Sequence, residues 1–394
     1  MEKKFDMLAL GEVLLRLSPE GNERLTQGTR FEKQLGGAEL NVAVGAANLG
    51  LTTGIISKIP SHAIGNYAKR EIRRNGVDTD YLAGDDSADS RLGIYYYEYG
   101  ADPRKPQVVY DRKYSSVNKL SLEDFPEEMY ENTRCFHTSG ITLGLGGPVR
   151  ENAIEMMKKF KEKGALISFD VNFRGNLWTG DEARDCITKI LPIVDIFFCS
   201  ESTANLTFGK TGDIKEILKS FSDEYDIAVV AATQRIVHSP KSHTFGSVIY
   251  EKKTDSYYEE KPYEKIEVVD RIGSGDAYIS GFLYGLLKEN GNCQAALEYG
   301  NAASAMKNTV SGDMLWTDPQ EMQQTIEMHH NIGQDFEMKR WSLLLARYIH
   351  NKRLLMLVIK GLAVSVGSFF RRSKLQKTIL CMLSAGNDSR NTLL

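Results

Sequence analysis

The feature that most constrains the fold is an alternation of short apolar runs with longer amphipathic segments. Short apolar runs lie at 135–139, 165–169, 193–199 and 227–232, and stretches with helical periodicity separate them. Strands that alternate with helices are joined by crossover connections, and they form a mostly parallel sheet with helices on both faces. Further strands are expected at 7–10 and 55–59, and further helices at 38–49, 277–288 and 294–310. The alternation predicts a doubly wound α/β fold.

One part of the chain departs from this alternation. Aromatic and β-branched residues gather between Arg91 and Arg112, in a pattern typical of paired strands rather than of strand–helix units. We therefore expect these residues to form a separate small β-sheet.

Composition narrows the class of protein. The chain has 394 residues, of which 42% are hydrophobic, and its net charge of −3 gives no sign of nucleic-acid binding. The five cysteines are widely spaced and form no C-x-x-C pair, so neither a disulfide framework nor a zinc site is indicated. The apolar run at 7–10 is too short for a signal peptide. We expect reduced thiols and a cytoplasmic location.

The carboxyl-terminal segment 336–394 differs from the rest, and we assign the main domain to 1–335. From Asp335 to Leu394 there are eleven Lys and Arg residues against three Asp and Glu residues. The seventeen-residue apolar run 354–370 contains Lys360 and is shorter than the about 20 residues that a transmembrane helix needs. An interfacial helix, a partner surface, or a stretch foreign to the ancestral gene are the open alternatives. The last two are favoured, and membrane contact is not.

The strongest local motif is D-R-I-G-S-G-D-A, which follows an apolar run at 266–269. Small residues at Gly273, Ser274 and Gly275 let the backbone approach a ligand, and N–H groups at the start of a helix bind anions, phosphate in particular. A carboxylate repels phosphate, so Asp276 makes chemical sense there as the base that accepts a proton from an attacking hydroxyl. The alternative is an ordinary glycine-rich turn with Asp276 capping the helix.

A second motif, G-G-A-E-L-N, opens the apolar helical stretch at 38–49. Gly36 and Gly37 allow a polyol to lie against the backbone, and Asn41 offers both a donor and an acceptor to a hydroxyl group. A tight turn before a core helix would explain the same residues.

Together, in this order, the two motifs resemble the paired signatures of the ribokinase/PfkB family of carbohydrate kinases, over about residues 5–335. Neither motif matches the Walker A pattern or the protein-kinase set. The resemblance implies a ribokinase-like fold with a β-sheet lid formed from about 12–35 and 88–115. It further implies ATP and Mg²⁺ as cofactors, and small-molecule partners. It also implies a homodimer through the lid.

Within this family the chain is most similar to 2-keto-3-deoxygluconate kinases. The resemblance implies that substrate is bound by Tyr95, Tyr110, Arg112, Asp170, Asn172, Arg174 and Asp313, besides Gly36, Gly37 and Asn41. A sugar acid carries a carboxylate, which calls for a guanidinium fork. Arg112 and Arg174 are the candidates for that fork. The alternative is that Arg112 lies in a solvated charge run and that the tyrosines pack a sheet.

The resemblance also implies a nucleotide site formed by Ser200, Glu201, Thr233, Gly273, Gly275 and Asn301. Many members of the family have N-x-x-E where this chain has Ser200-Glu201-Ser202-Thr203, so we assign no metal ligand. Arg271 beside the anion site is expected either to neutralise phosphate or to pair with a surface acid.

The expected function is ATP-dependent phosphorylation of a hydroxyl of a sugar acid, best matched by conversion of 2-keto-3-deoxygluconate to its 6-phosphate. Two alternatives stay open. Another sugar kinase of the same fold, such as a fructokinase, would not need the arginine pair. A non-catalytic sugar- or nucleotide-binding regulator is disfavoured by Asp276, and the altered segment at 200–203 leaves it open.

Overall fold

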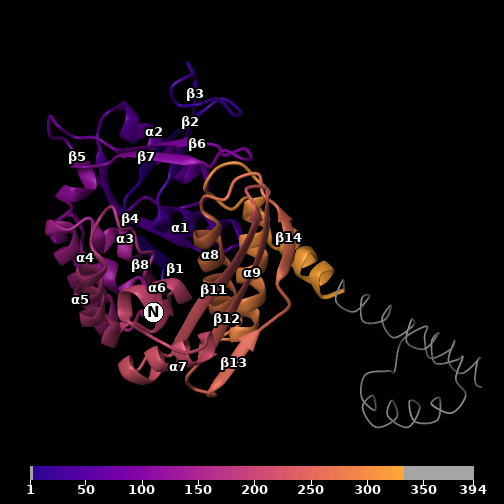
Figure 1. Cartoon of the computed structure of the whole chain (residues 1–394). Helices are drawn as coiled ribbons and strands as arrows, with labels where there is room; N and C mark the ends of the chain where they lie inside the picture. The colour runs from indigo at the N-terminus through magenta and orange to yellow at the C-terminus, as the bar shows by residue number, and fades with distance from the viewer. Residues whose placement is uncertain (1–2, 332–394) are drawn as a thin grey trace, which may run out of the picture. The chain divides into compact units, whose positions relative to one another are not determined.

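The computed structural model describes residues 3–331. A ten-stranded sheet forms the centre of this part of the chain (Figure 1). Its strands are β1 (Phe5–Leu10), β4 (Thr53–Pro60), β5 (Leu82–Asp85), β8 (Thr133–Ser139), β9 (Leu166–Asp170), β10 (Ile196–Phe198), β11 (Val229–Ser239), β12 (Ser242–Glu251), β13 (Ser256–Glu259) and β14 (Tyr263–Glu267). Their order is β13-β12-β11-β10-β9-β8-β1-β4-β5, with β14 paired to β12. Neighbours from β11 to β5 are parallel, which confirms the doubly wound sheet.

Helices cover both faces of this sheet. They are α1 (Ala38–Asn48), α2 (Ala63–Arg74), α3 (Gly140–Gly144), α4 (Gly147–Glu162), α5 (Gly180–Ile190), α6 (Glu201–Phe208), α7 (Ile214–Tyr225), α8 (Ser274–Lys288) and α9 (Cys293–Asn308). Adjacent residues of β10 pack into different cores, because strand side chains alternate between faces. Phe197 joins the core beneath α4, α5 and α7, whereas Phe198 joins the core beneath α1, α8 and α9.

The separate small sheet predicted from the aromatic segment is also present. It contains β2 (Leu14–Pro19), β3 (Phe31–Gly36), β6 (Gly93–Glu98) and β7 (Gln107–Asp111), in the order β3-β2-β6-β7. Strand β2 follows β1 directly in the chain, so the sheet lies beyond the carboxyl ends of the parallel strands, at the top of Figure 1. We call these four strands the lid.

Several boundaries differ from those expected. Strand β11 extends to Ser239 instead of stopping at 232, because its polar outer half pairs with β12 in a long hairpin. The expected strand at 193–199 begins only at Ile196, since Leu191–Ile193 forms a 3₁₀ turn. Helix α8 begins at Ser274 rather than at Ala277, which places Asp276 in its first turn.

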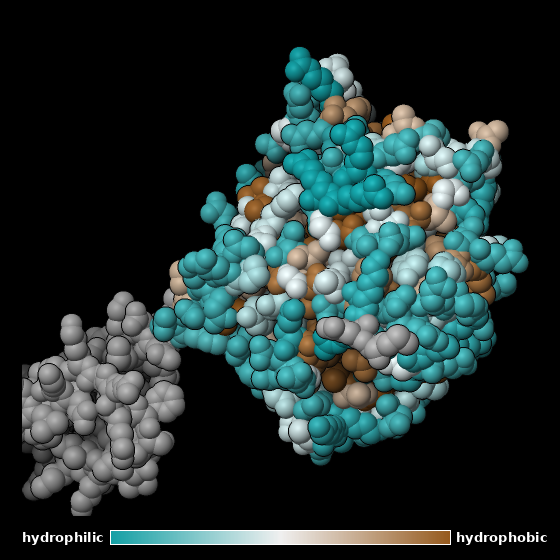
Figure 2. All heavy atoms as spheres, turned by 180° about the vertical axis from the view of Figure 1, so that it is seen from behind, coloured by the Kyte–Doolittle hydropathy of each residue, from teal (hydrophilic) through white to brown (hydrophobic). Residues whose placement is uncertain are grey.

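The described residues of the first unit, which ends at His329, include four of the five cysteines, all buried and free. In the part of the chain described here, no helix is both long and apolar enough to cross a membrane. Figure 2 shows one face of the molecule, on which hydrophilic residues predominate and apolar areas are small. The predicted extension 336–394, its boundary and the apolar run within it lie outside the described residues.

Candidate active site

A cavity of about 480 Å³ lies where the carboxyl ends of the parallel strands face the lid. Residues just beyond β1, β9 and β10 line it, namely Glu12, Asn172 and Ser200, and so does Arg235 within β11. In open α/β sheets the carboxyl ends of the strands are where ligands bind. Most of the predicted site residues, which are spread from 37 to 313 along the chain, line this one pocket.

The glycine-rich turn and the start of α8 form one end of the pocket. Gly273 has a φ of 79°, and a Cβ there would collide with the carbonyl oxygen of Asp313, so only glycine suits this position. A Cβ at Gly275 would meet nothing within 4 Å, so the backbone there is open to a ligand. The turn can therefore present the first N–H groups of α8 to an anion.

Two arginines face this same end of the pocket. Arg235 from β11 and Arg271 from the turn both line it. Desolvation lowers the pKa of Arg235, and the positive charge of Arg271 lowers it further. Like charges held together in a pocket are stabilised by a bound anion. This observation favours the phosphate-neutralising role of Arg271 over pairing with a surface acid.

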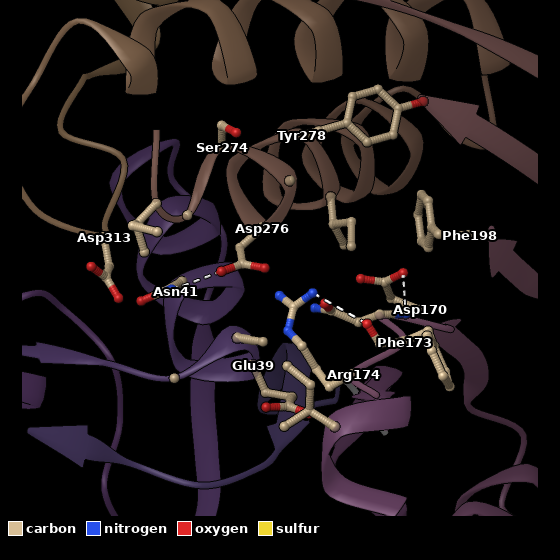
Figure 3. Close-up of a pocket in the computed structure, with 18 of the residues that line it drawn as sticks. Glu39, Asn41, Asp170, Phe173, Arg174, Phe198, Ser274, Asp276, Tyr278 and Asp313 are labelled. Atoms are coloured by element: carbon tan, nitrogen blue, oxygen red, sulfur yellow. Dashed lines mark hydrogen bonds between the residues drawn. The ribbon is translucent and has the colours of Figure 1, made fainter. Parts of the chain in front are cut away.

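Asp276 lies at the floor of the pocket, in the first turn of α8 (Figure 3). Asn41 of α1 donates a hydrogen bond from Nδ2 to its Oδ2 at 2.7 Å. Burial raises the pKa of Asp276 to about 7, and the hydrogen bond from Asn41 opposes that shift. The second amide atom of Asn41, Oδ1, is buried and has no hydrogen-bond partner among the described residues. An acceptor in that position suits a substrate hydroxyl.

Asp170 at the end of β9 and Arg174 just beyond that strand point toward Asp276, and Figure 3 shows the three side chains near one another. Burial raises the pKa of Asp170 to about 7, and the negative charge of Asp276 adds to the shift. Arg174 is exposed, and its guanidinium donates one long hydrogen bond, 3.4 Å, to the carbonyl of the neighbouring Phe173. This arrangement leaves the fork of Arg174 facing the pocket.

Arg112 differs from Arg174. Its side chain is 8% exposed, so it does not lie in a solvated charge run. Its Nε donates to Glu12 Oε2 at 2.8 Å, and its terminal nitrogen forms an ion pair with the same oxygen. Ser115 donates to the other oxygen of Glu12 at 2.5 Å. Arg112 thus lines the pocket already committed to a carboxylate of the protein.

Asp313 and the tyrosines of the lid complete the pocket. The hydroxyl of Tyr95 donates to Asp313, and Tyr110 lies beside Tyr95 with ring centroids 5.9 Å apart. Arg16 of β2 forms ion pairs with Asp313 and with Asp270, at 2.6 Å each. Burial raises the pKa of Asp313, and the charge of Arg16 opposes it. These bonds connect the lid to the turn that carries Asp276.

The structure separates the predicted nucleotide residues into two groups. Ser200 and Thr233 line the pocket. Glu201 is exposed in the first turn of α6 and does not line it. Asn301 is fully buried in α9, where it accepts from Ser247 at 2.8 Å and donates to Glu260 at 2.8 Å. Neither Glu201 nor Asn301 is placed to contact a ligand in this pocket.

The two glycines of the second motif lie close to ligand-facing groups. Gly37 lines the pocket with a φ of 128°, and a Cβ there would collide with the carbonyl oxygen of Glu12. Gly36 does not line it, and a Cβ there would collide with Asp313. Gly36 therefore permits close packing against Asp313, and Gly37 permits close packing against the backbone of Glu12.

No group of three or more His, Cys, Asp or Glu side chains that could hold a metal ion exists within 3–331. Mg²⁺ in phosphoryl transfer is usually held by one or two carboxylates together with substrate phosphates and water. Asp276 and Asp170 are carboxyl groups in the pocket that fit such a limited protein contribution.

Sequence reasoning missed three charged residues of the site. Glu12 holds Arg112, Arg16 holds Asp313 and Asp270, and Glu39 is buried at 1% exposure with hydrogen bonds from Ser139 (2.6 Å) and Thr142 (2.7 Å). Arg16 could have been noticed in the sequence, because it is a charged residue among the leucines of an apolar strand. The role of Glu12 depended on a partner 100 residues away.

Comparison with known proteins agrees with this geometry. The profile described as pfkB family carbohydrate kinase matches residues 4–319. The chain belongs to this family. It is a carbohydrate kinase, and the neighbouring structures described below share its ribokinase-like fold.

Relatives of this kinase act on related sugars according to their names. The 2-dehydro-3-deoxygalactonokinase of Haloferax volcanii is 32% identical over 321 residues, which cover 82% of this chain and 96% of that protein. The 5-dehydro-2-deoxygluconokinase of Clostridium perfringens is 29% identical over 321 residues, 79% of this chain and 90% of that protein.

Among solved structures, the 2-dehydro-3-deoxygluconokinase of Thermotoga maritima superposes with a TM-score of 0.78 at 31% identity, covering 83% of this chain and 100% of that one. A putative ribokinase II of E. coli, solved with ATP and Mg²⁺, has a TM-score of 0.71 at 21% identity and covers 84% of this chain and 100% of that one. At that sequence identity the similarity shows a shared fold and nothing more.

Proposed function

We propose that this kinase transfers the γ-phosphoryl group of ATP to a hydroxyl of a 2-keto-3-deoxy sugar acid, with 2-keto-3-deoxygluconate as the best-matched substrate. The observation that carries the proposal is Arg174, whose guanidinium faces the same pocket as the carboxyl of Asp276. A substrate carboxylate on Arg174 would form charge-assisted, bidentate hydrogen bonds. A neutral sugar has no anionic group to form such a bidentate pair.

In this proposal Asp276 is the general base. It would accept the proton of the attacking hydroxyl as the bond from that oxygen to the γ-phosphorus forms and the bond to the β,γ-bridging oxygen breaks. A pKa of about 7 suits this task, because catalysis by a base is most efficient when its pKa lies near the working pH. Asn41 orients the carboxyl through its 2.7 Å hydrogen bond.

The start of α8 would bind the transferring group. N–H groups of residues 274–276 point along the helix axis at its amino terminus, where the partial positive charge favours an anion. Arg235 and Arg271 would neutralise phosphate charge at the same end. Mg²⁺, when bound, supplies further neutralisation of the phosphate oxygens, with Asp276 or Asp170 as the carboxyl groups able to face it. The lid would exclude water that competes as acceptor.

Arg112 has a supporting role in this scheme. Its ion pair with Glu12 leaves it less able to bind a substrate carboxylate than Arg174. We infer that it shapes the lid wall, with Tyr95 and Tyr110, around the sugar. A homodimer through the lid and a cytoplasmic location remain predictions.

The test is ATP-dependent phosphorylation of 2-keto-3-deoxygluconate, 2-keto-3-deoxygalactonate, fructose and ribose by wild type and Arg174→Gln. We expect turnover chiefly on the two acids. In the variant, kcat/KM for the acids should fall about 10- to 100-fold, the loss of one charged hydrogen-bonding partner, with most of the change in KM. Activity on a neutral sugar should be unaffected.

Preference of the wild type for fructose or ribose would contradict the proposal and leave a sugar kinase of another specificity. An equal loss on acids and neutral sugars in Arg174→Gln would also contradict it, because the arginine would then act on a feature common to all substrates. Lys113→Gln is a suitable control, as it removes an exposed cation that does not line the pocket.

A further inference from the structure

Lys307 is a fully buried lysine behind the phosphate-binding turn. It lies in the last turn of α9 with an exposed fraction of 0%. Its ammonium donates to the backbone carbonyl of Asp270 at 3.0 Å and to that of Val310 at 3.4 Å. Burying a charge costs several kcal/mol unless its surroundings compensate. Carbonyl partners instead of a direct carboxylate partner make this an unusual site for a lysine.

The first carbonyl belongs to the most constrained residue of the turn. The N–H of Asp270 donates to the carbonyl of Asn308 at 3.2 Å. Its carboxylate accepts from Arg16 at 2.6 Å, from the N–H of Ile272 at 3.0 Å and from the N–H of Gly312 at 3.2 Å. Lys307 adds the bond to the remaining polar atom of Asp270. Every polar group of Asp270, the first residue of the turn, is therefore hydrogen-bonded within the protein.

The second carbonyl belongs to the loop on which the turn rests. Val310 lies three residues before Asp313, whose backbone is in such close contact with Gly273 that a Cβ would collide with it. One ammonium thus joins the segment that enters the turn to the loop that supports it. Displacement of either segment would move the N–H groups of residues 274–276.

The surrounding charges explain how the ammonium tolerates burial. Desolvation lowers the pKa of Lys307, while the negative charges of Asp270, Asp313 and Asp276 raise it and that of Arg16 lowers it. Three carboxyl groups therefore act on this cation without forming its direct bonds. The same cation lies behind the helix terminus that is expected to bind phosphate.

We propose that Lys307 is a positioning residue for phosphoryl transfer, a built-in cation that fixes the turn at 270–276 in the geometry that binds the transferring group. The inference rests on the proposed function, because it assigns phosphate to that turn. The simpler explanation is a lysine that only satisfies carbonyls at the end of α9. That role would make the variants less stable, but it would not lower kcat selectively while leaving KM unchanged.

The experiment compares Lys307→Met, which keeps the length of the stem, and Lys307→Ala with the wild type. We expect kcat to fall at least tenfold in both variants, with KM for the sugar changed less than twofold, because Lys307 itself does not line the pocket. ATP affinity measured by calorimetry without sugar should weaken at least fivefold. Methylammonium chloride should restore at least part of kcat in Lys307→Ala, since the small cation fits the space of the deleted ammonium.

Tetramethylammonium chloride at equal concentration is the control for ionic strength, because it has no N–H group. Lys58→Met is the matched control variant, since Lys58 is a half-buried lysine paired with Asp124 at 2.8 Å and does not line the pocket. It should keep kcat within twofold, with no response to methylammonium.

A folded Lys307→Met with kcat and ATP affinity within twofold of the wild type would overturn the inference. So would equal effects of the two ammonium salts on Lys307→Ala. If Lys307→Ala does not fold, Lys307→Met alone decides through kcat and ATP affinity. Failure of the proposed function would instead be visible in the wild type, as absence of turnover on the sugar acids, and the ATP-affinity measurement remains informative in that case.

Discussion

Two walls of the pocket carry similar charged residues but arrange them differently. We call the wall with Glu12 and Arg112 the lid wall, and the wall with Asp170, Arg174 and Asp276 the sheet wall. On the lid wall, Arg112 is bonded to Glu12 within the protein, and both are buried. On the sheet wall, Arg174 faces the pocket, and Asp170 and Asp276 lie near each other with raised pKa values.

The difference separates structural charge from reactive charge. A buried ion pair holds two segments in place, and its groups gain little from a ligand. Carboxyl groups whose ionisation is disfavoured by burial and by each other gain from a proton, a cation or an arriving substrate, and such groups cluster at functional sites. We therefore expect substitutions on the sheet wall to change catalysis and substitutions on the lid wall to change stability.

The largest effect should follow removal of the base on the sheet wall. Asp276→Asn should lower kcat by about 10²- to 10⁴-fold, the range expected when a general base is lost. Thermal stability and ATP affinity should be retained. Initial rates of ADP formation check this, with Asp111→Asn, an exposed carboxylate of β7 paired with Arg91, as the control that should keep activity. A loss below tenfold would place the base elsewhere.

The next effect concerns the lid wall and is one of stability. Arg112→Gln leaves the carboxylate of Glu12 buried without its cation, which should lower the free energy of unfolding by about 3–5 kcal/mol. The double variant Glu12→Gln/Arg112→Gln should recover more than half of that loss, because neither charge then remains buried. Urea unfolding measures both values.

The control for this comparison is Arg91→Gln, which removes a lid ion pair that is exposed to solvent and should cost less than about 1 kcal/mol. If Arg112→Gln destabilises no more than Arg91→Gln, the assignment of Arg112 to structure is wrong. In that case Arg112 would be available to bind substrate after all.

The smallest effect is the pH dependence of the sheet wall. Since the pKa values of Asp276 and Asp170 are both about 7, kcat/KM should fall as pH is lowered through 7 and the base becomes protonated. Removing one of two neighbouring negative charges favours ionisation of the other. Asp170→Asn should therefore move the acidic limb of the profile to lower pH. An unchanged limb would show that the two carboxyl groups do not interact.

The same two carboxyl groups also make the stability of the protein depend on pH. In the folded state each carboxyl binds its proton up to about pH 7, but in the unfolded chain only up to its ordinary value of 3.8. Stability should therefore decrease as pH rises through this window. Asp170→Asn removes part of that decrease, so it should raise the free energy of unfolding at pH 8 by about 0.5–2 kcal/mol, a common gain at active sites.

Much of the fold could be predicted, because strands and helices leave local periodic signals. Apolar runs such as 135–139 and 165–169 became β8 and β9 within two residues of the expected bounds. The hairpin of β11 and β12 could not be predicted to its full length. The outer residues of β11 are mostly polar and exposed, and they form a strand because they pair with β12.

By itself the sequence determined the two motifs, the base candidate Asp276 and the family, because backbone requirements of a glycine turn and a helix start are local and leave fixed spacing. Only the tertiary structure decided that Arg112 is paired with Glu12, that Arg174 faces the pocket, and that Lys307 is bonded to the carbonyl of Asp270. The reason is physical. Whether a charged group is satisfied depends on partners that lie 37 to 100 residues away in the chain, and burial and Coulomb interactions act through space.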